Sequence, residues 1–336
     1  MKTGISQKME TVINVRPYQL LCMVCSLGEG HSRPPDKQLA MIVDRIRANP
    51  DVPVTIRCNA GPSFEFQNVD SGNDTCEGAE YNQKRDLDIL HKLDLMPGAT
   101  LPARILFMRL FDRISTVEGI CGYATTTSKA WESCAKAKSG NYEKGHGLGF
   151  RAIIPARCEQ EMSDEKRKSI SALQTTENVN IRPHILLCAV CQYGQNVRAP
   201  FPEDNLPEFL EILFGNKPEI TVTLVRDADW TMCAPCPTRN PINNSCHTGR
   251  NGSGELYCQM KDLNVLQALG LTYGTSMRAR DFYKLAFEKI PDTAWVCALD
   301  NEGLLPHSVW FNACDARKTQ TAYENGRREL MKRMKL

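Results

Sequence analysis

The 336-residue sequence lacks several features that would narrow its function. It contains no apolar run approaching the roughly 18 residues of a membrane span. Its 41 basic and 39 acidic residues leave a net charge of +2, which provides no strong field to attract nucleic acid. The first residues, MKTGISQKMETV, contain no apolar segment of the signal-peptide type. We therefore expect a cytoplasmic protein that binds neither nucleic acid nor membranes.

Familiar catalytic patterns are also missing. No paired carboxylates, Ser–His–Asp pattern or kinase motif stands out, and the radical-type Cys-x-x-x-Cys-x-x-Cys spacing is absent. The glycines of residues 145–149, GHGLG, follow no clear strand, so a flexible connection is expected there rather than a phosphate loop. Whether the chain is an enzyme stays open.

What the sequence does contain is fifteen cysteines. Disulfide-rich scaffolds are typically short and secreted, whereas in a reducing cytosol clustered thiols are more often metal ligands or redox centres. An odd number of cysteines also leaves one thiol unpaired in any scheme made only of disulfides. Metal binding is therefore the favoured explanation for the cysteines.

A block of sequence occurs twice. The segment VINVRPYQLLCMVCSLG, residues 12–28, matches VNIRPHILLCAVCQYG, residues 179–194, and further matches join 84–95 to 260–271 and 104–114 to 280–290. Cysteines keep their places in both copies. The aligned pairs are Cys22/Cys188, Cys25/Cys191, Cys76/Cys246, Cys121/Cys297 and Cys134/Cys314.

The repeat predicts the domain organisation. We expect a first cysteine-rich repeat over residues 10–158, a polar linker or short surface helix over 159–178, and a second repeat over 179–330. In the second repeat, apolar spacing predicts helices at 184–193, 205–214, 260–269 and 278–290, and a β-branched strand at 219–225. The fold class expected is α+β: a helix-dominated tandem repeat of two similar domains, each with a small β element.

Two groups of thiols in the second repeat suggest a metal site. His184, Cys188 and Cys191 share one face of the first helix, although the first repeat has Tyr18 in place of the histidine, which favours a packing role for His184. Cys233 and Cys236 form a Cys-x-x-Cys in a loop expected over residues 227–254. Turn residues around these thiols leave no core to bury them in, and soft thiolates select zinc, copper(I) or iron–sulfur clusters.

A thioredoxin-like dithiol is the competing interpretation of Cys233 and Cys236. That chemistry requires the first cysteine at a helix N-terminus, where the helix dipole lowers its pKa. The following residues, PTRNPINN, are poor helix formers. Cys246 and Cys258 also exceed what a dithiol needs, so this interpretation is disfavoured.

The order Arg182-Pro183-His184, Cys188, a strand, then Cys233-x-x-Cys236-Pro and Cys246 resembles a prokaryotic family of small proteins. That family is known as a domain of unknown function and is suspected of binding iron–sulfur clusters. The resemblance covers most of 179–320 and, more faintly, 12–145. It implies four cluster ligands, with Cys297 and Cys314 in the cysteine-bearing tail. The ligands that it implies are Cys188, Cys233, Cys236 and Cys246.

The first repeat departs from this pattern, because Glu65 and Asn68 align with the Cys-x-x-Cys pair. We expect a degenerate site there, or none. The thiols that would form it are Cys22, Cys25, Cys58 and Cys76. The roles of Cys121, Cys134, Cys297 and Cys314 stay unassigned from sequence.

The sequence thus predicts an iron–sulfur protein with a [4Fe–4S] cluster, serving in electron transfer or redox sensing with a redox protein partner. A zinc-binding structural or interaction module is the alternative. A cluster- or thiol-dependent enzyme is a second alternative.

Overall fold

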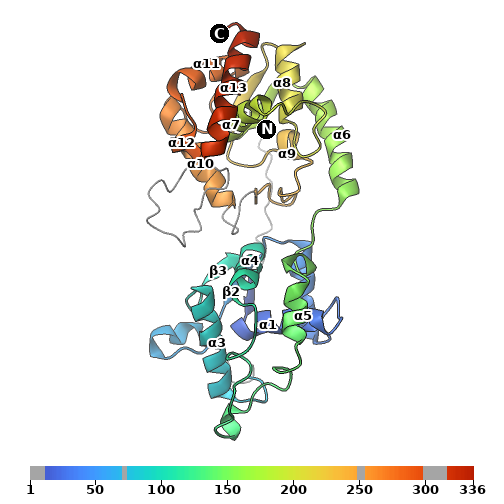
Figure 1. Ribbon diagram of the computed structural model, residues 1–336, viewed down its shortest axis with the longest axis vertical. Helices are drawn as coiled ribbons and strands as arrows, with labels where there is room; N and C mark the ends of the chain where they lie inside the picture. Colours follow the sequence, from blue (N-terminus) through green and yellow to red (C-terminus); the bar gives the residue numbers. More distant parts are fainter. Residues whose placement is uncertain (1–11, 70–73, 248–253, 298–315) are drawn as a thin grey trace, which may run out of the picture. The chain divides into compact units, whose positions relative to one another are not determined.

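A computed structural model describes residues 12–69, 74–247, 254–297 and 316–336. By its contacts the chain divides after Pro155 into unit 1, residues 1–155, and unit 2, residues 156–336. Helices predominate in both units, and each contains a small mixed sheet (Figure 1). The helix-dominated α+β class expected from the sequence is confirmed at this level.

Unit 1 begins with a short strand and a buried helix. Its elements are β1 (Ile13–Val15), α1 (Pro17–Gly28), α2 (Lys37–Ala48), β2 (Pro53–Ile56), η1 (Pro62–Gln67), α3 (Ala79–Leu93), β3 (Thr100–Pro102), α4 (Ala103–Arg113), η3 (Lys129–Trp131), α5 (Asn141–Gly147) and η4 (Phe150–Ala152).

Unit 2 adds an N-terminal helix and then follows a similar order. Its elements are α6 (Glu159–Thr175), β4 (Asn178–Ile181), α7 (Pro183–Gly194), α8 (Leu206–Phe214), β5 (Thr221–Leu224), α9 (Trp230–Cys233), α10 (Gly254–Leu269), β6 (Ser276–Arg278), α11 (Ala279–Lys289), α12 (Ala294–Cys297) and α13 (Ala316–Met334).

Each sheet has the same arrangement of three strands. In unit 1 the central β2 pairs parallel with β1 and antiparallel with β3; in unit 2 the central β5 pairs parallel with β4 and antiparallel with β6. The parallel pairs need a crossover, which α1 and α2 supply in unit 1 and α7 and α8 in unit 2. The strands of the two units therefore form separate sheets.

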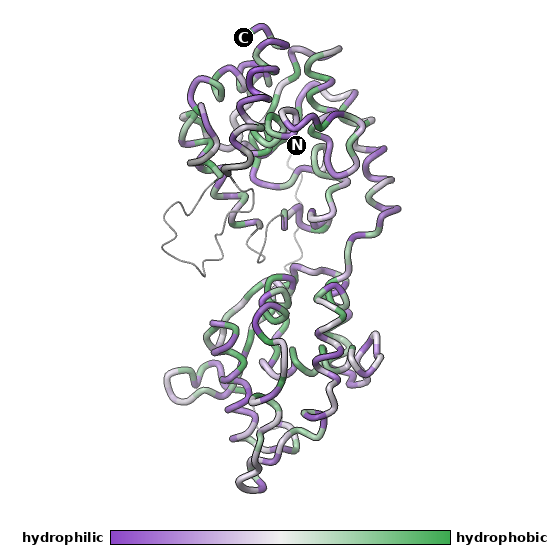
Figure 2. Tube along the Cα trace, in the orientation of Figure 1, coloured by the Kyte–Doolittle hydropathy of each residue, from purple (hydrophilic) through white to green (hydrophobic). Residues whose placement is uncertain are grey.

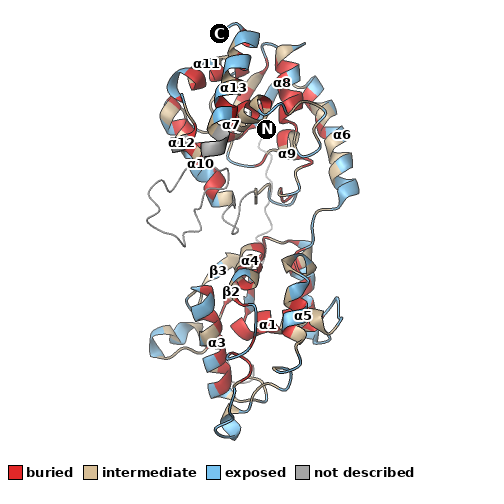
Figure 3. Ribbon diagram, in the orientation of Figure 1, coloured by how far each residue is buried: buried red, intermediate tan, exposed pale blue. Residues whose placement is uncertain are grey.

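The core of each unit is formed by apolar residues of the sheet and of several helices, including α1 in unit 1 and α7 in unit 2. Proline at the first turn starts α1 and α7, where its missing N–H costs no hydrogen bond. Most residues of both helices are buried (Figure 3). Apolar and polar stretches alternate along both units (Figure 2), as helices with one buried face require.

Glycine permits an unusually close helix contact in each unit. A methyl group added at Gly28 of α1 would lie 1.7 Å from the carbonyl oxygen of Asn141 in α5. One added at Gly194 of α7 would lie 1.8 Å from the carbonyl oxygen of Ala322 in α13. The backbones approach so closely that only glycine fits. Gly194 therefore serves packing, beyond ending its helix.

Several sequence-based expectations differ from the structure. The glycine segment 145–149 is mostly helical, within α5, because Gly145 packs against the backbone of α1. Of the two alternatives expected for 159–178, a linker or a short surface helix, the helix is found: α6 covers most of the stretch and also buries Ser169 and Leu173. The loop expected over 227–254 contains the short helix α9, and α10 begins at Gly254, six residues earlier than apolar spacing indicated. Among the described residues, no helix is long and apolar enough to cross a membrane.

Candidate metal centre

The first helix of unit 1 places two thiols on one face. Cys22 and Cys25 are three residues apart in α1, so their side chains lie one above the other. Both are partly buried and pack against the core. They form one wall of a surface cavity.

That cavity has a volume of about 390 Å³. Five cysteines from four separate stretches of chain line it. They are Cys22, Cys25, Cys76, Cys121 and Cys134. These are the five cysteines of unit 1 that have an aligned partner in the second repeat. Much of the remaining lining is apolar, from residues such as Leu21, Leu39 and Val117.

The thiols of the cavity lie close enough to influence one another. Burial raises the pKa of Cys22 to about 11 and that of Cys121 to about 12, and each also feels Cys134. Burial raises the pKa of Cys25 as well, and the thiols of Cys22, Cys121 and Cys134 add to that rise. Cys22, Cys25 and Cys121 are therefore protonated at neutral pH unless a cation displaces their protons.

A tyrosine holds two of the cysteines in place. The hydroxyl of Tyr81, buried in α3, donates to the carbonyl oxygen of Cys121 at 2.6 Å and accepts from the N–H of Cys134 at 3.2 Å. Cys121 and Cys134 are also joined directly, since the Cys134 N–H donates to the Cys121 carbonyl at 3.1 Å. One buried side chain therefore fixes the loop segments that carry both thiols.

Charged side chains also reach the cavity. Arg85 and Lys136 line it together with Glu29 and Glu77. Lys136 pairs with Glu29 at 2.6 Å. The guanidinium of Arg85 is buried, and it lowers the pKa values of Cys22 and Cys121 against the larger effect of burial.

The structure places the four thiols expected in unit 1 differently from one another. Cys22, Cys25 and Cys76 line the cavity, with Cys76 at an exposed position. Cys58 is not among the lining residues; it is fully buried just after β2, where burial and the nearby Asp86 raise its pKa to about 12. Cys121 and Cys134, left unassigned by sequence, also line the cavity. The alignment of cysteines between the repeats was the signal that could have identified them.

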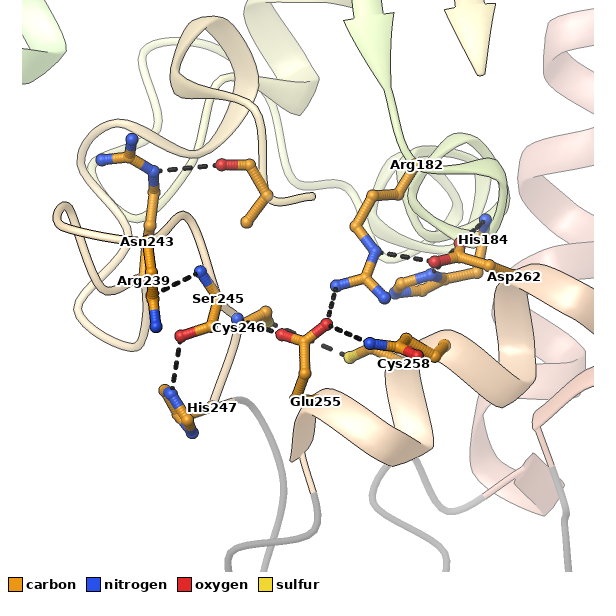
Figure 4. A network of polar contacts seen from close by, with 12 residues as sticks. Arg182, His184, Arg239, Asn243, Ser245, Cys246, His247, Glu255, Cys258 and Asp262 are labelled. Carbon is orange, nitrogen blue, oxygen red and sulfur yellow. Dashed lines mark hydrogen bonds and ion pairs between the residues drawn. The ribbon is translucent and has the colours of Figure 1, made fainter. Parts of the chain in front are cut away.

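In unit 2, the Cys-x-x-Cys segment lies near two further thiols. Cys233 interacts electrostatically with Cys236 and Cys246, and both raise its pKa. The sulfur atoms of Cys246 and Cys258 are 3.9 Å apart. Figure 4 shows Cys246 and Cys258 beside Glu255, whose carboxylate accepts from the N–H of Cys246 at 2.5 Å. The structure thus places Cys233 near Cys236 and Cys246, and Cys246 near Cys258, whereas the fourth expected ligand, Cys188, lies on the core near Tyr283.

The helix thiols of unit 2 pack on its core. Cys188 lies near Tyr283, whereas Cys191 and Cys297 both lie near Tyr323. Tyr257 donates its hydroxyl hydrogen to the carbonyl oxygen of Cys297 at 2.5 Å, as Tyr81 does for Cys121. Cys314 lies outside the described residues.

His184 has a structural role. It is fully buried, and its Nδ1 lies 2.6 Å from the carboxylate of Asp262, so Nδ1 carries the hydrogen and donates it. Arg182 pairs with the same carboxylate at 2.7 Å (Figure 4). Burial lowers the pKa of His184 to about 4, against the opposing effect of Asp262. His184 is therefore a neutral packing residue, as expected from its absence in the first repeat.

The thioredoxin-like interpretation has no structural support. Cys233 is the last residue of α9, so it lies at the wrong end of a helix for stabilising a thiolate. Burial raises its pKa well above the ordinary value. A nucleophilic thiol needs the opposite shift.

Five of the described cysteines of unit 1 line a cavity and do not converge on a single point. Within the ranges that the structure describes, no group of three or more Cys, His, Asp or Glu side chains converges as a single metal ion would require. In unit 1 the cysteines instead line a cavity large enough for a polyatomic group. Comparison with protein-family models, with curated proteins and with solved structures finds no match to this chain.

Proposed function

We propose that this chain is an iron–sulfur protein whose best-defined cluster site is the five-cysteine cavity of unit 1. The observation that carries the proposal is that thiols separated by up to 112 positions in the sequence line one cavity of about 390 Å³. Its role is electron transfer or redox sensing with a redox protein as partner, in the cytoplasm, without nucleic acid or membrane.

The cysteines of the unit 1 cavity fit an iron–sulfur cluster better than a single zinc ion. Zinc holds four thiolates at about 2.3 Å from a single point, and no such convergence occurs among the described side chains. An iron–sulfur cluster places several iron and sulfide atoms between its thiolates, so its ligands line a cavity. Four thiolates match a [4Fe–4S] group.

The five cysteines of the cavity have different proposed roles in binding the cluster. Cys22, Cys25, Cys121 and Cys134 influence one another and would hold the cluster. Cys76 is the exposed thiol of the cavity and is the fifth, spare candidate. When bound, the group supplies one-electron chemistry; the apolar lining limits access of water, which helps to set the potential.

We propose further that units 1 and 2 arose by tandem duplication. Support comes from contacts made by aligned residues: the three-strand order of each sheet, the Arg–Asp ion pairs, and the tyrosine bonds to Cys121 and Cys297. Unit 2 would then hold a related site. Its candidate ligands are Cys188, Cys191, Cys233, Cys236, Cys246 and Cys297.

A structural zinc site in unit 2 is the second candidate. It is favoured by the 3.9 Å separation of the Cys246 and Cys258 sulfurs, which is close to the spacing that zinc–sulfur bonds of about 2.3 Å impose on two ligands. Such a site requires Cys233 and Cys236 to turn toward this pair. An enzymatic role has no additional support among the described residues.

Anaerobic purification, followed by measurement of iron, sulfide and zinc per chain, tests the proposal. We expect iron and sulfide in about equal amounts. Cys121→Ser and Cys134→Ser should each remove the iron of unit 1, because each takes away one of four ligands. Cys58→Ala is the matched control: it removes a buried thiol of the same unit outside the cavity and should leave the iron content unchanged.

The outcomes separate the candidates. Protein that contains stoichiometric zinc and no sulfide contradicts the cluster and favours the structural site. Full iron loading in both Cys121→Ser and Cys134→Ser contradicts the ligand set in unit 1. Loss of iron in Cys58→Ala would contradict the cavity as its location.

A further inference from the structure

Arg85 brings an unpaired cationic donor to the five-cysteine cavity. Its side chain, on α3, is only 2% exposed and lines the cavity. One terminal nitrogen donates to Oδ1 of Asn82 at 2.5 Å, but Nε has no hydrogen-bond partner. A buried donor left unsatisfied is destabilising, and more so when it is charged.

The other buried arginines among the described residues of unit 1 pair with carboxylates. Arg16 pairs with Asp86 at 2.8 Å and Arg104 with Asp51 at 3.3 Å. No ion pair joins Arg85 to a carboxylate among the residues that the structure describes. Aromatic rings contact it instead, since its guanidinium carbon lies 4.1 Å from the ring centroid of Tyr18 and 5.1 Å from that of Tyr81.

The cavity thiols near Arg85 would become negatively charged if they lost their protons. Cys121 and Cys22 interact with its guanidinium more strongly than any other neighbouring groups. While those thiols are protonated they offer the cation no counter-charge. An anionic group bound through thiolates would supply the missing counter-charge, and its sulfur atoms would accept the free N–H.

The aligned position of unit 2 also carries a buried cation. Lys261 is 2% exposed, lies 4.5 Å from the ring of Tyr257, and lowers the pKa of Cys258 against larger effects that raise it. A buried cation beside the cysteines is therefore present in both units, although lysine offers a point charge and arginine a planar set of donors.

We infer that Arg85 compensates the negative charge of the thiolate-bound group and donates its Nε–H to the bound sulfur, which raises that group's reduction potential. This inference rests on the proposed function. Hydrogen bonds and positive charge near cluster sulfurs stabilise the more negative, reduced state. Arg85 is thus a charge-compensating residue.

Redox titration of the full-length, anaerobically purified protein tests this role. Arg85→Gln removes the charge; we expect it to retain the iron and sulfide content and to shift the midpoint potential to more negative values. Arg85→Lys introduces the residue found in unit 2 and should give a smaller shift in the same direction. Arg104→Lys, which alters a buried arginine outside the cavity, should leave the potential unchanged.

The results distinguish this inference from the proposed function. Wild-type protein without iron and sulfide contradicts the proposed function before any variant is compared. Wild-type potential in fully loaded Arg85→Gln overturns the role of Arg85 alone. If Arg85→Gln fails to fold, Arg85→Lys decides: a lower potential at full loading supports the role, and an unchanged potential overturns it.

Discussion

Units 1 and 2 share a buried ion pair but surround it differently. Arg16 and Asp86 in unit 1 occupy the places of Arg182 and Asp262 in unit 2, and the nitrogen–oxygen distances are 2.8 and 2.7 Å. Each aspartate also accepts from a backbone N–H of the first helix, at 2.9 Å in unit 1 and 3.0 Å in unit 2. Only in unit 2 does an imidazole add a further hydrogen bond, from His184.

This difference changes the state of the two carboxyl groups. Burial raises the pKa of Asp86 to about 6, because Arg16 and one N–H do not fully offset the lost hydration. For Asp262, burial is outweighed by His184 and Arg182, and the pKa is lowered. The position occupied by Tyr18 in one unit and by His184 in the other accounts for this contrast.

The thiols differ between the units in a similar way. Both units keep the tyrosine that holds Cys121 or Cys297, and both keep the glycine contact between helices. Unit 2 adds the Cys233–Cys236 segment where unit 1 has the 3-10 helix η1 (Pro62–Gln67). The two units thus share these helix and cysteine contacts, and they differ in the residues of the loops between their elements.

The largest expected effect comes from breaking the shared helix contact. A methyl group added to Gly145 would lie 2.0 Å from the carbonyl oxygen of Val24. Overpacking usually costs about 1–3 kcal/mol; here the obstacle is backbone, so we expect Gly145→Ala to lose about 4 kcal/mol or more in urea unfolding.

Gly147 provides the matched control in the same helix. A methyl group there meets nothing within 4 Å, so Gly147→Ala should be neutral or stabilising by about 0.5–1 kcal/mol. Gly326→Ala should repeat the large loss in unit 2, since its added methyl would lie 2.0 Å from the carbonyl oxygen of Val190. Equal stabilities of Gly145→Ala and Gly147→Ala would show that α1 and α5 do not pack this closely.

Removing the ion-pair carboxylates should affect the two units unequally. Asp262→Asn leaves buried Arg182 with only the longer ion pair to the partly exposed Glu255, at 3.4 Å, and removes the acceptor of His184, so it should cost about 3 kcal/mol at pH 7. Asp86→Asn should cost only about 1 kcal/mol, because ionised Asp86 is already disfavoured by burial and Asp74 still pairs with Arg16 at 2.6 Å. Urea unfolding of both variants measures the difference, and equal losses would refute the contrast.

Much of the secondary structure follows from local sequence. The expected helix at 184–193 matches α7, and the strand expected at 219–225 contains β5 (Thr221–Leu224), because apolar periodicity and β-branching reflect burial directly. Helix α10 begins earlier than expected because its first turns also bury apolar residues, Tyr257 and Cys258. The buried charged residues Lys261 and Asp262 interrupt the apolar pattern of that face, and Glu255 adds contacts to Arg182 and Cys246 at the same end.

The site was less predictable than the helices. The backbone at Cys121 and Cys134 is held beside the cavity by hydrogen bonds to the hydroxyl of Tyr81. These bonds join residues far apart in the sequence, so no motif spacing predicts them. Cys58 was expected there because it follows a strand, but strand alternation directs it into the core. The better guide was register between the repeats, since the unit 1 cysteines with aligned partners line the cavity and Cys58 has none.

The last expected effect is a contrast in pH dependence between the two units. Asp86 has a raised pKa of about 6 in the folded state, so its contribution is fully present below its unfolded pKa near 3.8 and is lost as the pH rises through 6. His184 has a lowered pKa of about 4, so the folded state is destabilised as the pH falls from 6.5 to 4. Over this window, unit 1 should gain stability on acidification while unit 2 loses it, each by roughly 1–2 kcal/mol.

Urea unfolding of wild type, Asp86→Asn and His184→Asn between pH 4 and 7 tests this contrast. The stability of wild type relative to Asp86→Asn should fall as the pH rises, whereas its stability relative to His184→Asn should rise, because each variant removes one titrating group. Amide hydrogen exchange in α3 and α10 assigns each trend to its unit. Parallel trends in the two comparisons would mean that the tyrosine-to-histidine difference does not set the protonation of the shared ion pair.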